Sequence, residues 1–501
     1  MRIRYEKRRA VYTLTGLERL RLKVQWCENA ACSRHHQPYR PEAEGGIALP
    51  HHEFGLDVIA LIGALRHRAH RSVPEIHGAL TERGLLICER SVTNLLDRYD
   101  ELVAAALDAP NRAALAAQGR VILALDGLQP DVGHEVLWVI RDCLSGRVLL
   151  ARPLLSATQA DLASLLREVA AALEVPVAGV VSDGQHAIRR AVAEALPGVP
   201  HQLCQFHYLR EAARPLFEAD RHAKKELKKT VRGVRPVERR MEGRDDEAAR
   251  VVAGYCAAVR SALTDDGRPP LTAPGLRLKE RLDAIAGSLD RVAGKWGLSK
   301  PLDRLRALIR RGLARTAALW PDVRETHRWL HAAAHILGNP ARHPAATVQA
   351  RYDRLITAWS TRRERAGTLA PAVDHFLKVT ASDRPGLFHC YAVSGLPRTN
   401  NDLEHLFGSH RHHERRATGR KVASLSLVLR GSVRIVATTA TRITAFSGHH
   451  LAAIDRRQWH ALRNALEVRR QARACRTRFR RNQDTYLADL ERRAGQPRLP
   501  T

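Results

Sequence analysis

The chain has 501 residues, more than one compact hydrophobic core usually serves, so several domains are expected. It carries 82 Lys and Arg against 52 Asp and Glu, and the formal net charge of +30 favours a polyanionic partner, nucleic acid before an anionic membrane. No apolar run of about 18 residues is present, and the N-terminus lacks the apolar segment of a secretory signal, so a membrane-spanning or exported protein is not expected. The eight scattered cysteines are typical of reduced thiols in the cytoplasm.

The first 53 residues look like an irregular arm. Cys27 and Cys32, with two histidines close behind them, are candidate ligands of a zinc knuckle. The remaining ligands do not stand at the usual spacing, so a loosely ordered arm without metal is the alternative.

Helical patterns occupy residues 54–116. One helix is expected to begin at Ser72, with Glu75 three residues on as in a capping box, and the last to begin near Glu89–Arg90 and run about three turns. Two short helices joined by a turn are the layout of a helix-turn-helix DNA-binding domain, and a small helical bundle without a DNA role is the alternative. The residues expected to face DNA are Arg90 and Asn94.

Strand and helix patterns alternate from residue 117 to 215. RVILALDG (120–127) and VAGVVSDG are apolar runs that end in an acid, and Ser145–Gly146 marks a hairpin between two further runs. A helix should start at Ser156 or Thr158. The order strand, hairpin, helix, strand, helix, strand, helix predicts a mixed sheet covered on both faces.

Strand signals vanish between residues 216 and 385, where the patterns are basic, amphipathic and helical. We interpret this stretch as a helical insertion between two parts of one α/β domain. Residues 386–450 then contain an apolar segment that is a helix or a helix–strand mixture, and residues 451–501 form an Arg-rich tail.

Three carboxylates have spacing that points to metal chemistry. Asp126 and Asp183 each end an apolar strand and precede a glycine. If the strands are neighbours, the two acids lie side by side and repel each other unless a cation separates them. Glu404, in TNNDLEHLFG, would complete a site for two Mg²⁺ or Mn²⁺ ions, which suits phosphodiester chemistry.

Each of these acids also has a purely structural interpretation. Asp-Gly after a strand is a common turn signal. Asn401 followed by Glu404 resembles a capping box, with Asn401 as the N-cap. Nearby acids that compete for the metal role are Asp131, Asp142 and Asp402.

Four motifs occur in a fixed order along the chain: LALDG at Asp126, VSDG at Asp183, CQFH at Cys204 and His207, and TNNDLEHLFG at Glu404. Together, over about residues 117–450, they resemble the DDE transposases of bacterial insertion sequences, in particular the Mutator-like branch. The resemblance implies an α/β ribonuclease-H-like catalytic core interrupted by an all-α insertion, preceded by the helix-turn-helix region.

The resemblance also implies an activity and partners. Asp126, Asp183 and Glu404 would be catalytic and bind two Mg²⁺ ions, cutting transposon ends with water and joining the freed 3′-hydroxyl to target DNA. The expected partners are double-stranded DNA, with its terminal inverted repeats, and further copies of the chain in a dimer or larger assembly. A DNA-binding regulator on a transposase scaffold, or a nuclease or resolvase without strand transfer, are the alternatives.

Cys204 and His207 have three interpretations. They are half of a zinc site, a nucleophile with its base, or structural residues with His207 near the acids as an accessory group. The basic run after Glu404 is expected to hold phosphates beside the cut, although charge runs are often solvated faces. Its candidate contacts are Arg415, Arg416, Arg420 and Lys421.

These predictions divide the chain into six segments: an N-terminal arm (1–53), a helix-turn-helix domain (54–116), the first part of the core (117–215), the helical insertion (216–385), the second part of the core (386–450) and the basic tail (451–501).

Overall fold

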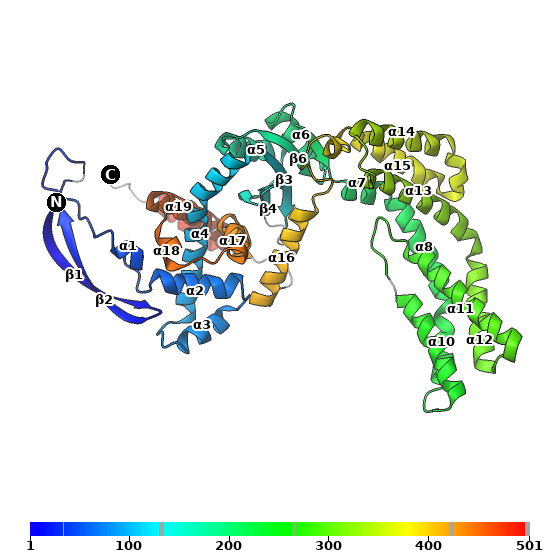
Figure 1. Cartoon of the computed structure of the whole chain (residues 1–501). Helices are drawn as coiled ribbons and strands as arrows, with labels where there is room; N and C mark the ends of the chain where they lie inside the picture. The colour runs from blue at the N-terminus through cyan, green and yellow to red at the C-terminus, as the bar shows by residue number, and fades with distance from the viewer. Residues whose placement is uncertain (34, 130–134, 265, 421–424, 496–501) are drawn as a thin grey trace. The chain divides into compact units, whose positions relative to one another are not determined.

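The computed structural model describes residues 1–33, 35–129, 135–264, 266–420 and 425–495 (Figure 1). The chain forms two compact units. Their bounds are Met1–Val180, Ala187–Val199 and Asn401–Thr501 for the first, and Val181–His186 and Pro200–Asn400 for the second.

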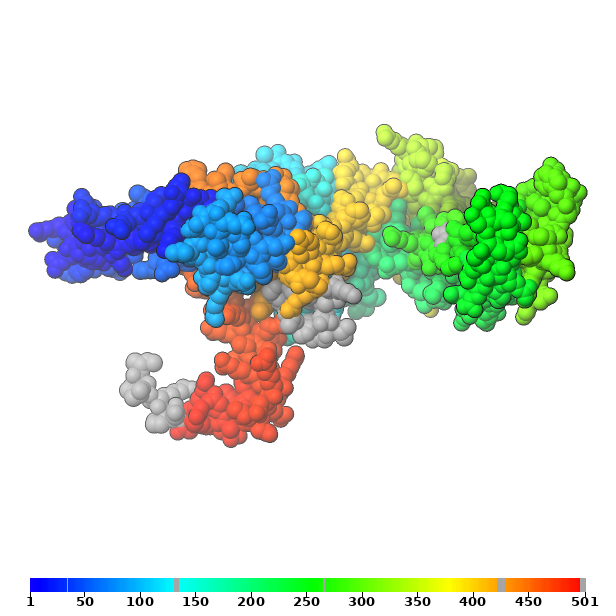
Figure 2. Space-filling view, turned by 90° about the horizontal axis from the view of Figure 1, so that it is seen from below, coloured from blue at the N-terminus to red at the C-terminus, as the bar shows by residue number. Residues whose placement is uncertain are grey.

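The N-terminal residues form a long antiparallel hairpin of β1 (Arg2–Thr13) and β2 (Gly16–Trp26). It projects from the helices of the first unit (Figure 2). The prediction of an irregular arm was therefore wrong here. Charged side chains on both faces of β1 hide the alternation, which shows in β2, where Leu22 and Val24 are buried and their neighbours are not.

Three helices follow, with bounds α2 (Leu56–His67), α3 (Val73–Thr81) and α4 (Glu89–Gln118), after the single turn α1 (Glu44–Ile47). The predicted capping box of Ser72 and Glu75 is confirmed, as is the start of the last helix. However, α4 continues for 30 residues, well beyond three turns. Its apolar residues pack along this whole length, as far as Leu115, and Gly119 ends it in the left-handed conformation.

Segments from opposite ends of the chain share the core of this helical region. The C-terminal helices are α17 (Leu425–Ile443), α18 (Gly448–Ala452), α19 (Arg456–Arg481) and α20 (Gln483–Ala494). Ala437, Leu451 and Trp459 of the first three are buried among residues of α2, α3 and α4. The apolar segment after Glu404 is thus a helix, one of the two forms predicted.

A five-stranded mixed sheet has the order β5-β4-β3-β6-β7. Its strands are β3 (Val121–Leu128), β4 (Val136–Asp142), β5 (Val148–Leu154), β6 (Val177–Ser182) and β7 (His201–Leu203). β3, β4 and β5 are antiparallel neighbours. The amide of Val121 donates to the carbonyl of Pro176, so β3 and β6 start side by side and run parallel.

The two faces of the sheet are covered by different helices. On one face Leu123 and Leu125 pack against α5 (Gln159–Ala172) and α6 (His186–Ala195). On the other face α17 lies so close to β4 that a side chain on Gly431 would lie 2.5 Å from Leu137. The predicted order of strands, hairpin and helices is confirmed, with Thr158 as the N-cap of α5.

Among its described residues, the second unit contains the end of β6 and the short β7, and its other regular elements are helices. Its helices are α7 (Gln205–Ala212), α8 (Arg214–Val231), α9 (Arg235–Arg239), α10 (Glu247–Thr264), α11 (Pro274–Trp296), α12 (Lys300–Arg315), α13 (Trp320–Gly338), α14 (Ala345–Thr361) and α15 (Ala370–Asp383). They form two cores, one of α8 to α12 and one centred on α7 and α13 to α15. The described part of 216–385 is helical, as the sequence predicts.

Candidate functional site

Asp126 lies within β3, two residues before its end, and not at the strand end as predicted. It pairs with Val139, so strand alternation puts it on the face opposite Leu125, the face that α17 covers. Its carboxylate accepts a hydrogen bond of 2.7 Å from the amide of Gly127. Gly127 makes no turn. A side chain there would lie 2.8 Å from Val136 of the neighbouring strand, so glycine is needed for close packing.

Glu404 lies in the first turn of α16 (Asn401–Thr418), and α16 packs against β3. Both elements belong to the first unit, so the helix that carries Glu404 contacts the strand that carries Asp126. Asn401 is the first helical residue of α16, not the residue before it, so the predicted N-cap position was one residue too late. Glu404 is half-buried.

Asp183 directly follows β6 and forms a turn of the kind that the structural interpretation predicted. Both of its carboxylate oxygens accept hydrogen bonds from Gln185, one from the amide at 3.1 Å and one from the side chain at 2.8 Å. Gly184 has a φ of +82°, which explains the glycine. The turn fixes the carboxylate just after the strand that neighbours β3 in the sheet.

The competing acids differ from these three. Asp142 is fully buried and accepts hydrogen bonds from Gln118, Ile122 and Ser145, so it stabilises the β4–β5 turn. Burial alone would raise the pKa of its carboxyl, but these donors outweigh burial and lower the pKa. Asp402 is exposed. Asp131 lies outside the described residues.

Cys204 and His207 lie at the start of α7 in the second unit. Cys204 is fully buried, its amide donates to Ser182, and its sulfur accepts from the amide of Asn400 at 3.4 Å. The cysteine thus joins the end of β6 to the residue before α16. These contacts favour the structural interpretation for Cys204. His207 is half-buried and lies edge-on to the ring of Phe206.

The C-terminal half of α16 is held by α2, α3 and α17. His413 is fully buried, and its Nδ1 lies 2.8 Å from the Nδ1 of His70. Two such nitrogens can share a hydrogen bond only if one is deprotonated, and burial lowers the pKa of both rings accordingly. Arg66 donates to the carbonyl of Ala417 at 3.1 Å, and Arg416 pairs with Glu75 at 2.8 Å.

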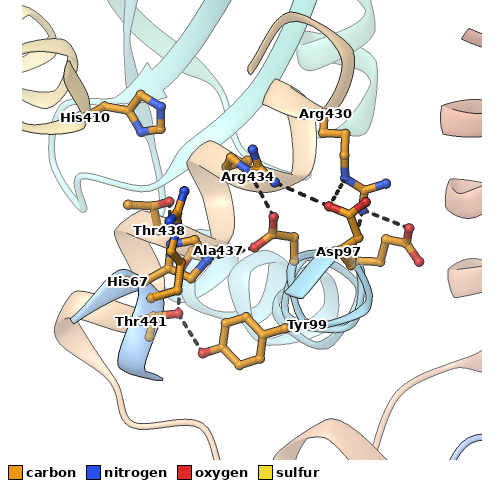
Figure 3. A network of polar contacts seen from close by, with 12 residues as sticks. His67, Asp97, Tyr99, His410, Arg430, Arg434, Ala437, Thr438 and Thr441 are labelled. Carbon is orange, nitrogen blue, oxygen red and sulfur yellow. Dashed lines mark hydrogen bonds and ion pairs between the residues drawn. The ribbon is translucent and has the colours of Figure 1, made fainter. Parts of the chain in front are cut away.

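A buried cluster of charges joins α17 to α4 (Figure 3). Arg434 contacts Asp100 at 3.1 Å and Asp97 at 3.3 Å, and Arg430 contacts Asp97 at 3.0 Å. His67 of α2 completes the cluster, 2.8 Å from Asp100. Burial would raise the pKa of Asp100, but His67 and the two arginines lower it to about 2. Asp100 therefore stays ionised, and its contacts with Arg434 and His67 fix α17, which also packs on the sheet.

The residues predicted to bind DNA differ in whether they already form an ion pair. Arg90 and Asn94 are exposed one turn apart on α4, and Arg415 and Arg420 are exposed at the end of α16. Arg416 is exposed as well, but its ion pair with Glu75 occupies it. Lys421 lies outside the described residues.

Sequence reasoning missed two sets of residues. The first is the cluster of His67, Asp100 and Arg434, in which Arg434 lies more than 300 residues after the other two, so no spacing signal links it to them. The second is the exposed face of the hairpin, where Arg8 pairs directly with Arg21 across the strands. Period-two alternation in β2 was the signal that could have revealed it.

Three carboxylates are a suitable donor set for Mg²⁺ or Mn²⁺, which prefer oxygen ligands. Among the described residues, no group of three or more His, Cys, Asp or Glu side chains is arranged as a metal site. Cys27 and Cys32 are half-buried thiols in one turn, where the amide of His36 donates to the carbonyl of Cys27. Zinc binding by this turn stays a prediction.

No protein-family model matches the chain, and no curated protein matches it. None of the helices in the described residues has both the length and the apolar character needed to cross a membrane.

Proposed function

We propose that this protein is a DDE transposase that cuts DNA at the ends of a mobile element and joins them to target DNA. Asp126, Asp183 and Glu404 would bind two divalent cations, Mg²⁺ or Mn²⁺. When bound, these ions would activate the attacking oxygen and stabilise the leaving oxygen of the phosphodiester.

One observation carries the proposal. Asp126 points to the face of the sheet covered by α17, and the helix that begins with Asn401 and carries Glu404 packs against the same strand. Two acids separated by 278 positions in the sequence thus lie on contacting elements. Asp183 follows the strand next to β3, and its turn holds its carboxylate in a fixed orientation.

The contacts around α16 support a positioning role for its C-terminal half. Glu404 lies at one end of the helix, and the other end is anchored by His413, Arg66 and Arg416. A carboxylate on an anchored helix keeps its orientation at low entropic cost. Exposed cations such as Arg415 would bind phosphates on either side of the cut.

The decisive experiment uses the purified chain with a plasmid that carries the DNA flanking its own gene, with Mg²⁺ or with EDTA. We expect Mg²⁺-dependent cleavage at inverted repeats in that DNA, followed by joining to a second plasmid. Asp126→Asn and Glu404→Gln should each abolish cleavage and leave DNA binding in EDTA unchanged.

Asp402→Asn is the matched control, because Asp402 is an exposed acid two residues from Glu404 on the same helix. It should cleave at the parent rate. Binding without any nick would indicate a regulator instead, and cut ends that never join would indicate a nuclease or resolvase. If Asp402→Asn lost as much cleavage activity as the other two variants, the assignment of Asp126, Asp183 and Glu404 as the metal site would be wrong.

A further inference from the structure

A concave, cationic surface lies on α8 in the second unit. The groove has a volume of about 620 Å³ and is open to solvent. Five Lys and Arg side chains line it, against the two carboxylates of Glu218 and Asp266. The five cations are Arg221, Lys224, Lys225, Lys228 and Arg232.

Most of these cations form no direct ion pair among the residues that the structure describes. Lys224 is buried and pairs with Asp266 at 2.5 Å, which uses one of the two acids. Arg221, Lys225, Lys228 and Arg232 form no hydrogen bond or ion pair with any other residue that the structure describes. Asp266 also attracts Lys228 and Arg221 at longer range, so the positive charge of the groove is compensated only in part.

The crowding has an electrostatic effect. Partial burial lowers the pKa of Lys228, and the charges of Lys224 and Arg232 lower it further, although Asp266 opposes them. Repulsion between like charges in a groove lowers the stability of the fold unless a bound anion neutralises them.

The arrangement of the four cations indicates the shape of that anion. They stand at positions i, i+4, i+7 and i+11, which fall on one face of a helix. The stripe is about 16 Å long at 1.5 Å per residue. One strand of a DNA duplex advances by about five phosphates over that distance. A single phosphate group would engage only one end of the stripe.

We propose that this groove binds the phosphodiester backbone of double-stranded DNA, as a second DNA contact outside the site of the three acids. The recognition is of backbone charge and carries no base specificity. The preference for a linear polyanion follows from the stripe, whereas the choice of DNA over RNA rests on the proposed function.

The test measures binding of the full chain to a fluorescent duplex in EDTA, by anisotropy, over a series of salt concentrations. The groove variant is Lys225→Ala with Lys228→Ala. The matched control is Lys229→Ala with Arg304→Ala, which removes the same charge from exposed positions outside the groove. Thermal unfolding by circular dichroism checks that both variants are folded.

We expect the groove variant to bind more weakly, and its plot of log K against log salt to be shallower by about 1.8, since each lost phosphate contact contributes about 0.9. The control should keep the parent slope. Equal changes in both variants would show that only net charge matters and would overturn the proposal.

Two competitor molecules, ATP and RNA, distinguish duplex DNA from the other anions that the groove could bind. Displacement of the duplex by ATP at equal phosphate concentration would indicate a nucleotide pocket, and stronger competition by RNA would indicate an RNA site. Either result would overturn the proposal. Because EDTA removes the divalent cations that cleavage requires, failure of DNA cleavage leaves this result unaffected, and the two proposals fail separately.

Discussion

At Gly63, α2 packs closely against α4. A side chain on Gly63 of α2 would lie 2.3 Å from ring atoms of Tyr99 on α4. Tyr99 is fully buried, and its hydroxyl lies 2.8 Å from that of Thr441 on α17. The ring is therefore held from two sides and cannot easily move to make room.

Gly63→Ala should lower the free energy of unfolding by about 1–3 kcal/mol, the usual cost of overpacking a core. Gly78→Ala is the control, because Gly78 also lies inside a helix but has no atom within 4 Å of the added carbon. Better helix propensity should raise its stability by about 0.5–1 kcal/mol. Urea unfolding of both variants measures the difference, and equal effects would contradict the close packing of α2 on α4.

His410 makes stability depend on pH. Burial lowers the pKa of this imidazole to about 4. The charged or titratable groups near it include Glu414 and His413 on its own helix, Arg434 and Arg442 on α17, and His67 on α2. In the unfolded chain the imidazole of His410 is protonated below about pH 6.5, whereas in the folded chain it is protonated only below about pH 4. Stability is therefore complete above pH 6.5 and falls as the pH falls toward 4.

His410→Leu should remove this part of the pH dependence. The loss between pH 6.5 and 5 amounts to about 2 kcal/mol at 1.4 kcal/mol per pH unit. Urea unfolding at the two pH values measures it in parent and variant. A variant with the same pH slope as the parent would exclude His410 as the cause.

At the scale of elements, the charged cluster decides how α17 packs on α4. Burial would lower the pKa of Arg434, but Asp100 and Asp97 outweigh burial and raise it. The guanidinium is thus a counterion of the buried Asp100 and the half-buried Asp97. Its removal leaves Asp97 with Arg430 alone and Asp100 with His67 alone.

Arg434→Met should destabilise the protein by about 3–5 kcal/mol, the range for breaking a buried ion pair. Arg416→Met breaks the exposed pair with Glu75 and should change stability little, since solvent screens such pairs. Thermal unfolding of the two variants provides the comparison. A small effect at Arg434 would mean that water reaches the cluster.

The elements themselves were largely predictable from sequence. The strands of the sheet, the hairpin at Ser145–Gly146 and the caps at Ser72 and Thr158 follow from local signals of periodicity and turn chemistry. The hairpin β1–β2 could not be predicted, because charged side chains obscure its alternating pattern. The length of α4 could not be predicted either, because long-range packing sets it. For the candidate site, the sequence predicts Asp126 and Glu404 as metal ligands, and that role stays a prediction. Only the strand register shows which face of the sheet Asp126 occupies.

At the scale of the whole molecule, both ends of the chain complete one core. Trp459 of α19 is buried among residues of α2, α3 and α4. The ring nitrogen of Trp459 donates a hydrogen bond of 3.2 Å to Glu101. The basic tail predicted for residues 451–501 thus contains a core element. By contrast, α20 has no buried residue.

Two truncations should therefore behave differently. A chain that ends at Arg481 loses only α20 and the residues after it, and its thermal unfolding should match that of the parent. A chain that ends at Ile454 loses Trp459, whose burial alone is worth about 3–5 kcal/mol, and should unfold at a lower temperature or be insoluble. Equal stability of the two chains would show that α19 is dispensable.

The shared core also affects how the protein is made. Helices α2 to α4 emerge from the ribosome with the apolar surface that Ala437, Leu451 and Trp459 later cover. Roughly 330 residues separate the end of this surface from Ala437, and their synthesis takes roughly 15 to 70 seconds at about 5–20 residues per second. During that interval the apolar surface of the nascent chain is exposed to solvent. The yield of folded protein in cells should therefore depend on chaperones that bind nascent polypeptides.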